Sequence, residues 1–148
     1  MSLEGRVMGL DIGDVRTGVA LSDPLGIIAQ AHAVIDASPP QRAVEALRKI
    51  VEEQGVTHIV AGLPLNQRGE RGPQAEKVLS FIELLRTAVP VEVSTIDERF
   101  STAGAQRSLL EAGMRRKGRK QVIDKVAAQQ ILQTYLDRRK HLGTSPSP

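Results

Sequence analysis

Short apolar runs alternate with turn-forming residues over the first part of the chain. Residues 7–11 and 17–21 form two such runs around a tight turn that contains Gly13, and residues 31–36 form a third. Apolar runs bounded by Gly, Asp and Pro are typical of strands. The connections are too short for the crossover that parallel neighbours need, so the pattern predicts an antiparallel meander.

After the meander, apolar residues recur at helical spacing and alternate with two further strand-like runs. The first predicted helix lies between an N-cap at Ser38 and a C-cap at Gly55, and a strand over 56–62 follows it. A helix around 78–85 and a strand over 91–96 come next. The chain then continues with a helix capped by Ser101 and a last helix whose apolar stripe covers 123–135.

This order of elements predicts an α/β fold. Three meander strands followed by αβ units give a mixed five-stranded sheet, with a three-strand antiparallel meander, two parallel strands and helices on both faces. Sheets of this kind bind ligands at the carboxyl ends of their strands. We expect residues 1–140 to form a single domain and residues 141–148, "HLGTSPSP", to be a disordered tail.

Composition narrows the class of protein. The chain has 148 residues, of which 41% are apolar and only 2% aromatic, so the core is expected to be aliphatic. The absence of cysteine excludes disulfides, cysteine zinc sites and thiol nucleophiles. No stretch approaches the roughly 20 apolar residues of a membrane span, and no signal-peptide run is visible. A cytoplasmic protein without membrane contact is expected.

Positive charge is concentrated in one segment. The formal net charge is +3, and residues 115–120, "RRKGRK", contain five basic side chains. Without these five, acidic residues would outnumber basic ones by two. The segment is either a solvated charge run or a contact for a polyanion. The candidate contacts to nucleic-acid phosphates are Arg115, Arg116, Lys117, Arg119 and Lys120.

Acidic residues lie at three places where this architecture puts functional groups. Asp11 lies late in the first apolar run, Asp97 and Glu98 directly follow the last strand, and Asp124 lies in the first turn of the last helix. If the first strand is central and the last helix packs over its end, these carboxylates converge. Clustered carboxylates repel one another unless a cation neutralises them.

Each acidic position also has a structural interpretation, as a turn former or as a favourable charge at a helix N-terminus. Together, however, Asp11, Asp124 and one of the neighbours Asp97 and Glu98 favour a metal site, because alternation near a strand end cannot tell these two apart. Hard oxygen ligands select Mg²⁺ or Mn²⁺. Two such ions about 4 Å apart are suited to phosphodiester hydrolysis, so two ions are expected here.

Four motifs carry a resemblance to the YqgF/RuvX family, and the match spans about residues 6–137. The D-x-G-x-x-R-x-G-x-A motif of that family resembles "LDIGDVRTGVALSD" (10–23), and its G-x-P-x-N loop resembles "VAGLPLNQRGERG" (60–72). Its D-E-R-x-S/T element resembles "DERFST" (97–102). Its terminal-helix Asp, followed by small and apolar residues, resembles "VIDKVAAQQIL" (122–132).

The resemblance implies a ribonuclease H-like fold, related to that of Holliday-junction resolvases, and a metal-dependent nuclease activity. The family is associated with processing of the 5′ end of precursor 16S ribosomal RNA. On this resemblance, Asp11, Glu98 and Asp124 correspond to the catalytic carboxylates and metal ligands of the family. RNA is then favoured over branched DNA as the partner, and a homodimer is possible.

Three further side chains are candidates for substrate binding. Arg16 and Arg99 suit phosphate contacts, because a guanidinium matches phosphate bidentately, and an ion pair with a carboxylate is weighed equally for each. Asn66 either touches substrate or forms a turn. His58 lies in a predicted strand, where a hydrogen-bonded core histidine is favoured over a ligand.

Two other functions compete with a nuclease. An actin or sugar-kinase type of ATPase also begins its phosphate-binding strand with D-x-G, but 148 residues supply only one of the two domains needed, and no P-loop is present. A non-catalytic RNA-binding assembly factor would explain the basic segment without chemistry. A junction resolvase acting on DNA is the remaining alternative within the nuclease class.

Overall fold

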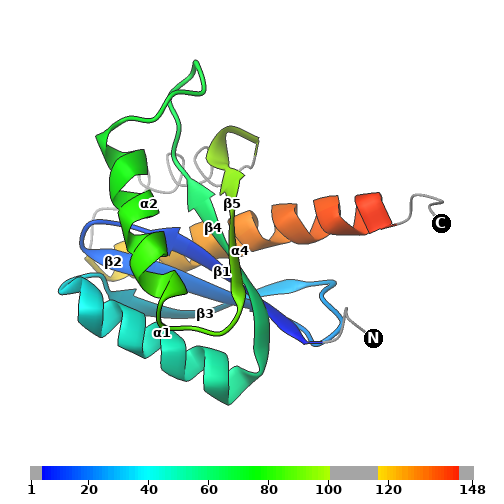
Figure 1. Ribbon diagram of the computed structural model, residues 1–148. Coiled ribbons are helices and arrows are strands. Elements are labelled where there is room, and N and C mark those ends of the chain that lie inside the picture. The colour runs from blue at the N-terminus through cyan, green and yellow to red at the C-terminus, as the bar shows by residue number, and fades with distance from the viewer. Residues whose placement is uncertain (1–4, 101–116, 144–148) are drawn as a thin grey trace.

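The computed structural model describes residues 5–100 and 117–143, with side-chain detail over 5–99 and 124–140 (Figure 1). The elements are β1 (Arg6–Ile12), β2 (Arg16–Ser22), β3 (Ala29–Asp36), α1 (Pro40–Gln54), β4 (Val56–Leu63), α2 (Pro73–Arg86), β5 (Glu92–Asp97), a 3₁₀ turn (Glu98–Phe100) and α4 (Lys117–Gly143).

The strands form one mixed sheet in the order β3-β2-β1-β4-β5. β1 pairs antiparallel with β2 and parallel with β4, while β2–β3 is antiparallel and β4–β5 is parallel. α1 and α2 cover one face of the sheet and α4 covers the other (Figure 1). The predicted meander, the two parallel strands and the helices on both faces are therefore confirmed.

Two separate apolar clusters pack the two faces of the sheet. On β1, Met8 and Leu10 pack with residues of α1 and α2, whereas Val7 packs with residues of α4. Successive side chains of a strand point to opposite faces, so a central strand covered on both sides is apolar along its whole length. This double burial explains the unbroken apolar run that precedes Asp11.

Glycines bring α4 unusually close to the sheet. Gly9 on β1, Gly18 on β2 and Gly62 on β4 form a surface, here named the glycine seat, on which α4 lies. A Cβ at Gly18 would lie 2.1 Å from the backbone oxygen of Asp124, and Cβ atoms at the other two would lie 2.5 and 2.6 Å from side chains of α4. A Cβ at Gly9 or Gly18 would meet atoms that cannot rotate away, so these two positions need glycine, whereas at Gly62 it would meet the movable end of the Ile131 side chain.

Element boundaries correct several predictions from the sequence. Pro39 is the N-cap of α1 and makes no side-chain capping bond, so the prediction of a cap at Ser38 is wrong. Gly55 does end this helix, in the left-handed conformation with φ 66°. The predicted helix capped by Ser101 lies outside the described residues.

The last helix starts earlier than its apolar stripe indicated. α4 begins at Lys117, so Asp124 is its eighth residue and not part of its first turn. The segment "KGRK" has no apolar periodicity and contains a glycine, a poor helix former, which explains the difference. At the other end α4 continues to Gly143, so residues 141–143 are helical and not part of a disordered tail, whereas 144–148 lie outside the described residues.

No helix in the described part of the chain is both long enough and apolar enough to cross a bilayer.

The glycine seat predicts a specific sensitivity to added methyl groups. Gly18→Ala forces the new Cβ against the α4 backbone, which cannot rotate away as a side chain can. We expect a loss of about 1–3 kcal/mol in the free energy of unfolding, measured by urea denaturation, as for other overpacked sites. Gly72→Ala is the matched control, because nothing lies within 4 Å of its added Cβ. Equal losses in the two variants would contradict the close approach of α4.

Candidate active site

The register of the sheet places Asp11 between two members of the glycine seat. Asp11 pairs with Gly18 on β2, and Leu10 pairs with Ala61 on β4, so that Gly62 lies level with Asp11 on the other side. Neighbouring residues at one level of a sheet point to the same face. The Asp11 side chain therefore lies on the α4 face, where it is 7% exposed.

The other two predicted carboxylates reach the same face from outside the sheet. The backbone oxygen of Asp124 lies directly over Gly18, the β2 partner of Asp11. The Glu98 Oε2 atom lies 3.1 Å from the position that a Cβ of Gly62 would occupy. Thus the structure brings Asp124 and Glu98 to opposite flanks of Asp11, at the carboxyl end of β1.

Asp124 is held by an arginine from the neighbouring strand. Arg16 Nε donates to Asp124 Oδ2 at 3.2 Å, and both side chains are about one-fifth exposed. Of the two roles weighed for Arg16, the described structure contains the ion pair with a carboxylate. This ion pair orients the Asp124 side chain toward β2.

The donor set suits a hard cation in its chemistry. All three side chains offer carboxylate oxygens, which Mg²⁺ and Mn²⁺ prefer, and Asp11 is a buried charge of the kind that a metal or a partner must compensate. Within the described residues, however, no three carboxylate or imidazole groups are drawn together closely enough to hold an ion.

The Asp97 side chain is hydrogen-bonded to Arg99. Its Oδ2 accepts from Arg99 Nε at 2.9 Å and from Arg99 Nη2 at 2.6 Å, and its Oδ1 accepts from the backbone N–H of Arg99 at 2.9 Å. These bonds with Arg99 hold the pKa of the Asp97 carboxyl below its usual value. Of the two roles weighed for Arg99, the described structure thus contains the ion pair with a carboxylate, here that of Asp97.

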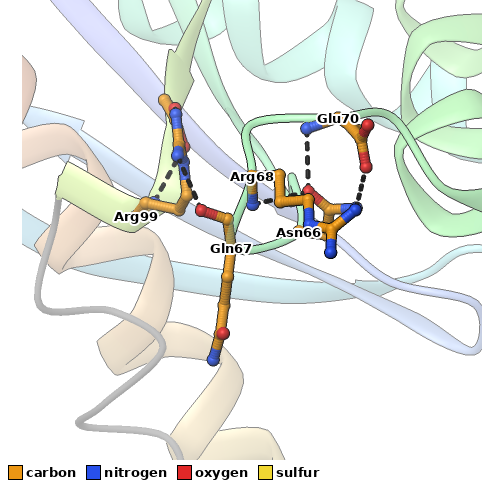
Figure 2. A network of polar contacts seen from close by, with 6 residues as sticks. Asn66, Gln67, Arg68, Glu70 and Arg99 are labelled. Carbon is orange, nitrogen blue, oxygen red and sulfur yellow. Dashed lines mark hydrogen bonds and ion pairs between the residues drawn. The ribbon is translucent and has the colours of Figure 1, made fainter.

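Asn66 closes a loop between β4 and α2 (Figure 2). Its Oδ1 accepts the backbone N–H groups of Arg68 and Glu70 at 2.8 and 2.9 Å, and its Nδ2 donates to Glu70 Oε1 at 2.9 Å. A bridge between Leu65 and Arg71 closes the base of the loop. Of the two roles considered for Asn66, the structure shows the turn.

Known proteins resemble this chain in sequence and in fold over most of its length. The family model described as "RuvX: Holliday junction resolvase" matches residues 5–138. The chain belongs to the RuvX family. A relative from Clostridioides difficile (strain 630), named "Putative pre-16S rRNA nuclease", is 49% identical over 135 residues, which are 91% of this chain and 96% of the relative. A protein of the same name from Natranaerobius thermophilus is 44% identical over 133 residues, with 90% and 94% covered.

Solved structures extend the likeness of this RuvX protein at the level of the fold. Thermus thermophilus RuvC in complex with a Holliday junction substrate superposes with a TM-score of 0.57 at 16% identity, covering 92% of this chain and 96% of RuvC. The Fowlpox virus resolvase bound to junction DNA gives a TM-score of 0.55 at 10% identity, covering 90% and 98%. The ribonuclease H-like fold expected from the resemblance is confirmed.

The basic segment of this RuvX chain is described only in part. Arg115 and Arg116 lie outside the described residues. Lys117, Arg119 and Lys120 belong to the first turn of α4, of which the backbone alone is described. Their role as phosphate contacts therefore stays a prediction, and they belong to a helix that also carries Asp124.

His58 is a hydrogen-bonded histidine on the α4 face, as predicted. Its Nε2 lies 2.8 Å from Ser94 Oγ, its Nδ1 lies 3.4 Å from Glu92 Oε1, and its ring stacks on Tyr135 at a centroid distance of 5.4 Å. Burial lowers the pKa of His58, and the charge of Arg139 lowers it further, while Glu92 acts in the opposite direction.

A cavity of about 580 Å³ lies on the opposite face of the sheet, between the β1–β2 turn, α1 and α2. It is lined by Ile12, Asp14, Lys77 and Phe81 among others, and it does not include Glu98 or Asp124. Its acidic lining residues are Asp14 and Glu76, and none of the three predicted metal ligands lines it. The candidate active site is therefore the α4 face around Asp11.

The environment of His58 predicts a pH dependence of stability. Because its pKa in the folded protein is lowered, the unfolded chain binds a proton more readily below about pH 6.5. The free energy of unfolding should therefore fall as the pH drops from about 7 to 5, and His58→Gln should flatten this slope in urea titrations. His32→Gln is the control, because His32 is exposed on β3. Parallel curves for wild type and His58→Gln would contradict the expectation.

Proposed function

We propose that this protein is a divalent-metal-dependent nuclease that hydrolyses phosphodiester bonds in the 5′-end processing of precursor 16S ribosomal RNA. Membership of the RuvX family and the names of its relatives support the class of reaction and the substrate. The single observation that supports the proposal is the position of Asp11, buried on the α4 face at the carboxyl end of β1, with the Asp124 backbone over its neighbour Gly18 and Glu98 over its neighbour Gly62.

The catalytic work is assigned to this carboxylate set. Asp11, from the rigid central strand, would hold the metal in a fixed position, with Glu98 and Asp124 completing the protein ligands. A divalent ion at such a site activates water and stabilises the leaving oxygen of the phosphodiester. Arg16 keeps Asp124 compensated until the ion is bound, which limits the repulsion among the three carboxylates in the free protein.

Binding of the nucleic acid is assigned to positive charge near this face. The basic residues at the start of α4 would contact the phosphate backbone without reading sequence, and they belong to the same helix as Asp124. The proposal places the protein in the cytoplasm, with residues 1–140 as its catalytic domain. A homodimer is not needed for trimming RNA, whereas cutting two strands of a junction would suit one.

Resolution of Holliday junctions is the second candidate function. The description of the matching family favours it, and the solved structures with this fold include resolvases bound to junction DNA. A binding factor without catalysis remains the third outcome of the experiment below, because it would also use the basic segment.

The decisive test of function replaces one carboxylate. Asp11→Asn keeps the shape of the side chain and removes its charge, so we expect cleavage to fall by about 100-fold or more while RNA binding remains. The assay compares precursor 16S RNA, single-stranded DNA and four-way junctions with Mg²⁺ or Mn²⁺. Asp14→Asn is the matched control, since Asp14 is exposed in the next turn and pairs with Lys77 at 3.3 Å.

Three results of this assay separate the candidates. Cleavage of the RNA alone, lost in Asp11→Asn and kept in Asp14→Asn, supports the proposal. Preferential cleavage of the four-way junction would assign the protein to junction resolution. Binding without cleavage of any substrate by the wild type would make it a non-catalytic factor.

Metal binding is tested separately from cleavage. A ligand that binds only the folded state stabilises it by about 2.7 kcal/mol at 100 times its dissociation constant. We expect Mn²⁺ to raise the free energy of unfolding of the wild type, and to do so much less in Asp11→Asn and Asp124→Asn. Asp137→Asn, on an exposed part of α4, is the control and should respond as the wild type does. An equal response of all four proteins would exclude a metal site on these carboxylates.

A further inference from the structure

Arg99 connects two segments that flank the candidate active site. Its Nε and Nη2 donate to the carboxylate of Asp97 at the end of β5, while its Nη1 donates to the backbone oxygen of Gln67 at 3.3 Å (Figure 2). Gln67 lies in the loop that Asn66 closes. One planar side chain thus joins the end of the edge strand to the loop between β4 and α2.

The Asp97–Arg99 contact fixes the turn that carries Glu98. The carboxylate of Asp97 accepts from both the guanidinium and the backbone N–H of Arg99, so the residues on either side of Glu98 are bonded to each other. Two donors of one planar guanidinium meet at Oδ2 while the backbone N–H of Arg99 binds Oδ1, so the contact has a defined direction. The backbone of Glu98 is therefore set with its carboxylate over Gly62, beside Asp11.

The loop that receives Arg99 is closed by its own contacts. The three bonds of the Asn66 side chain define it from 66 to 70, and it is named here the 66–70 loop. The guanidinium also lies against Gly69, where φ is +79° and an added Cβ would be 3.0 Å from Nη2. Arg99 thus contacts the backbone of the 66–70 loop rather than a mobile side chain.

These contacts already compensate the charge of Arg99. Asp97 offsets the charge of the guanidinium, and each of the three guanidinium nitrogens donates to a protein acceptor, so at most two of its five N–H groups remain for a substrate phosphate. This geometry disfavours the direct phosphate contact that the sequence left open for Arg99.

We propose that Arg99 is a positioning residue that locks the Glu98 turn to the 66–70 loop, through Asp97 and the Gln67 carbonyl, and does not contact substrate phosphate. The inference rests on the proposed nuclease function, because positioning matters through Glu98 as a ligand at the active site. It assigns Asp97 to the support of that site and not to the metal.

The first test separates positioning from phosphate binding. Arg99→Lys keeps the charge and loses the planar fork, and Arg99→Gln loses both. As a positioning residue, Arg99 should be poorly replaced by Lys, so both variants should lower the single-turnover cleavage rate by about 10- to 100-fold, as small misplacements do. The salt dependence of RNA binding should stay unchanged. Retained activity in Arg99→Lys, together with a salt slope reduced by about 0.7 in Arg99→Gln, would identify a phosphate contact and overturn the proposal.

The second test asks whether Arg99 acts through Asp97. We expect Asp97→Asn to lower the cleavage rate in the same way, and the double variant Asp97→Asn/Arg99→Gln to be no slower than the worse single variant. Independent effects that multiply in the double variant would contradict a shared contact.

The third test needs no cleavage, so it stays informative if the proposed function fails. Hydrogen exchange followed by mass spectrometry should be faster in both the 66–70 loop and the 97–100 turn of Arg99→Gln. Arg48→Gln is the matched control, because Arg48 is bonded to Glu45 and Glu52 within α1 and should change exchange in α1 alone. Unchanged exchange in the loop and turn of Arg99→Gln would overturn the positioning role, whereas a wild type that cleaves nothing would overturn the nuclease function only.

Discussion

The close approach of α4 to the sheet is the constraint on which the rest of this structure depends. Gly9, Gly18 and Gly62 remove the Cβ atoms that would keep the helix away, and the α4 backbone lies directly on β2 at Asp124. Small residues on the helix side, Ala127 and Ala128, are fully buried against the same surface. Dispersion and apolar burial then favour a single placement of the helix, since the interior leaves no room for another.

This placement decides where charge is tolerated. The α4 face is apolar along most of its length, and at the carboxyl end of β1 it carries Asp11, which is buried between two glycines of the seat. A buried carboxylate without compensation would destabilise the fold strongly. Arg16 balances the neighbouring carboxylate of Asp124, which limits the negative charge that gathers at this end of the face.

The edge of the sheet is organised by a second, smaller set of contacts. Arg99 binds the carboxylate of Asp97 at the end of β5 and the backbone oxygen of Gln67 in the β4–α2 connection. These two segments are neighbours because β4 and β5 pair in parallel. The conformation of the Glu98 turn is therefore set by local hydrogen bonds, whereas the position of Asp124 is set by helix packing. The two flanks of Asp11 are supported independently, by different kinds of interaction.

The sequence by itself determined the strands, the meander, both parallel additions and the family, because apolar periodicity, turn residues and short motifs are local signals. It also singled out Asp11, Glu98 and Asp124. The Asp97–Arg99 pair and the bonds of Asn66 join residues two to four apart, and the sequence left each open between two roles. Tertiary structure alone decided that Arg16 pairs with Asp124 and that Glu98 lies over Gly62. These residues are far apart in the chain, and contacts between distant segments are encoded by no local pattern.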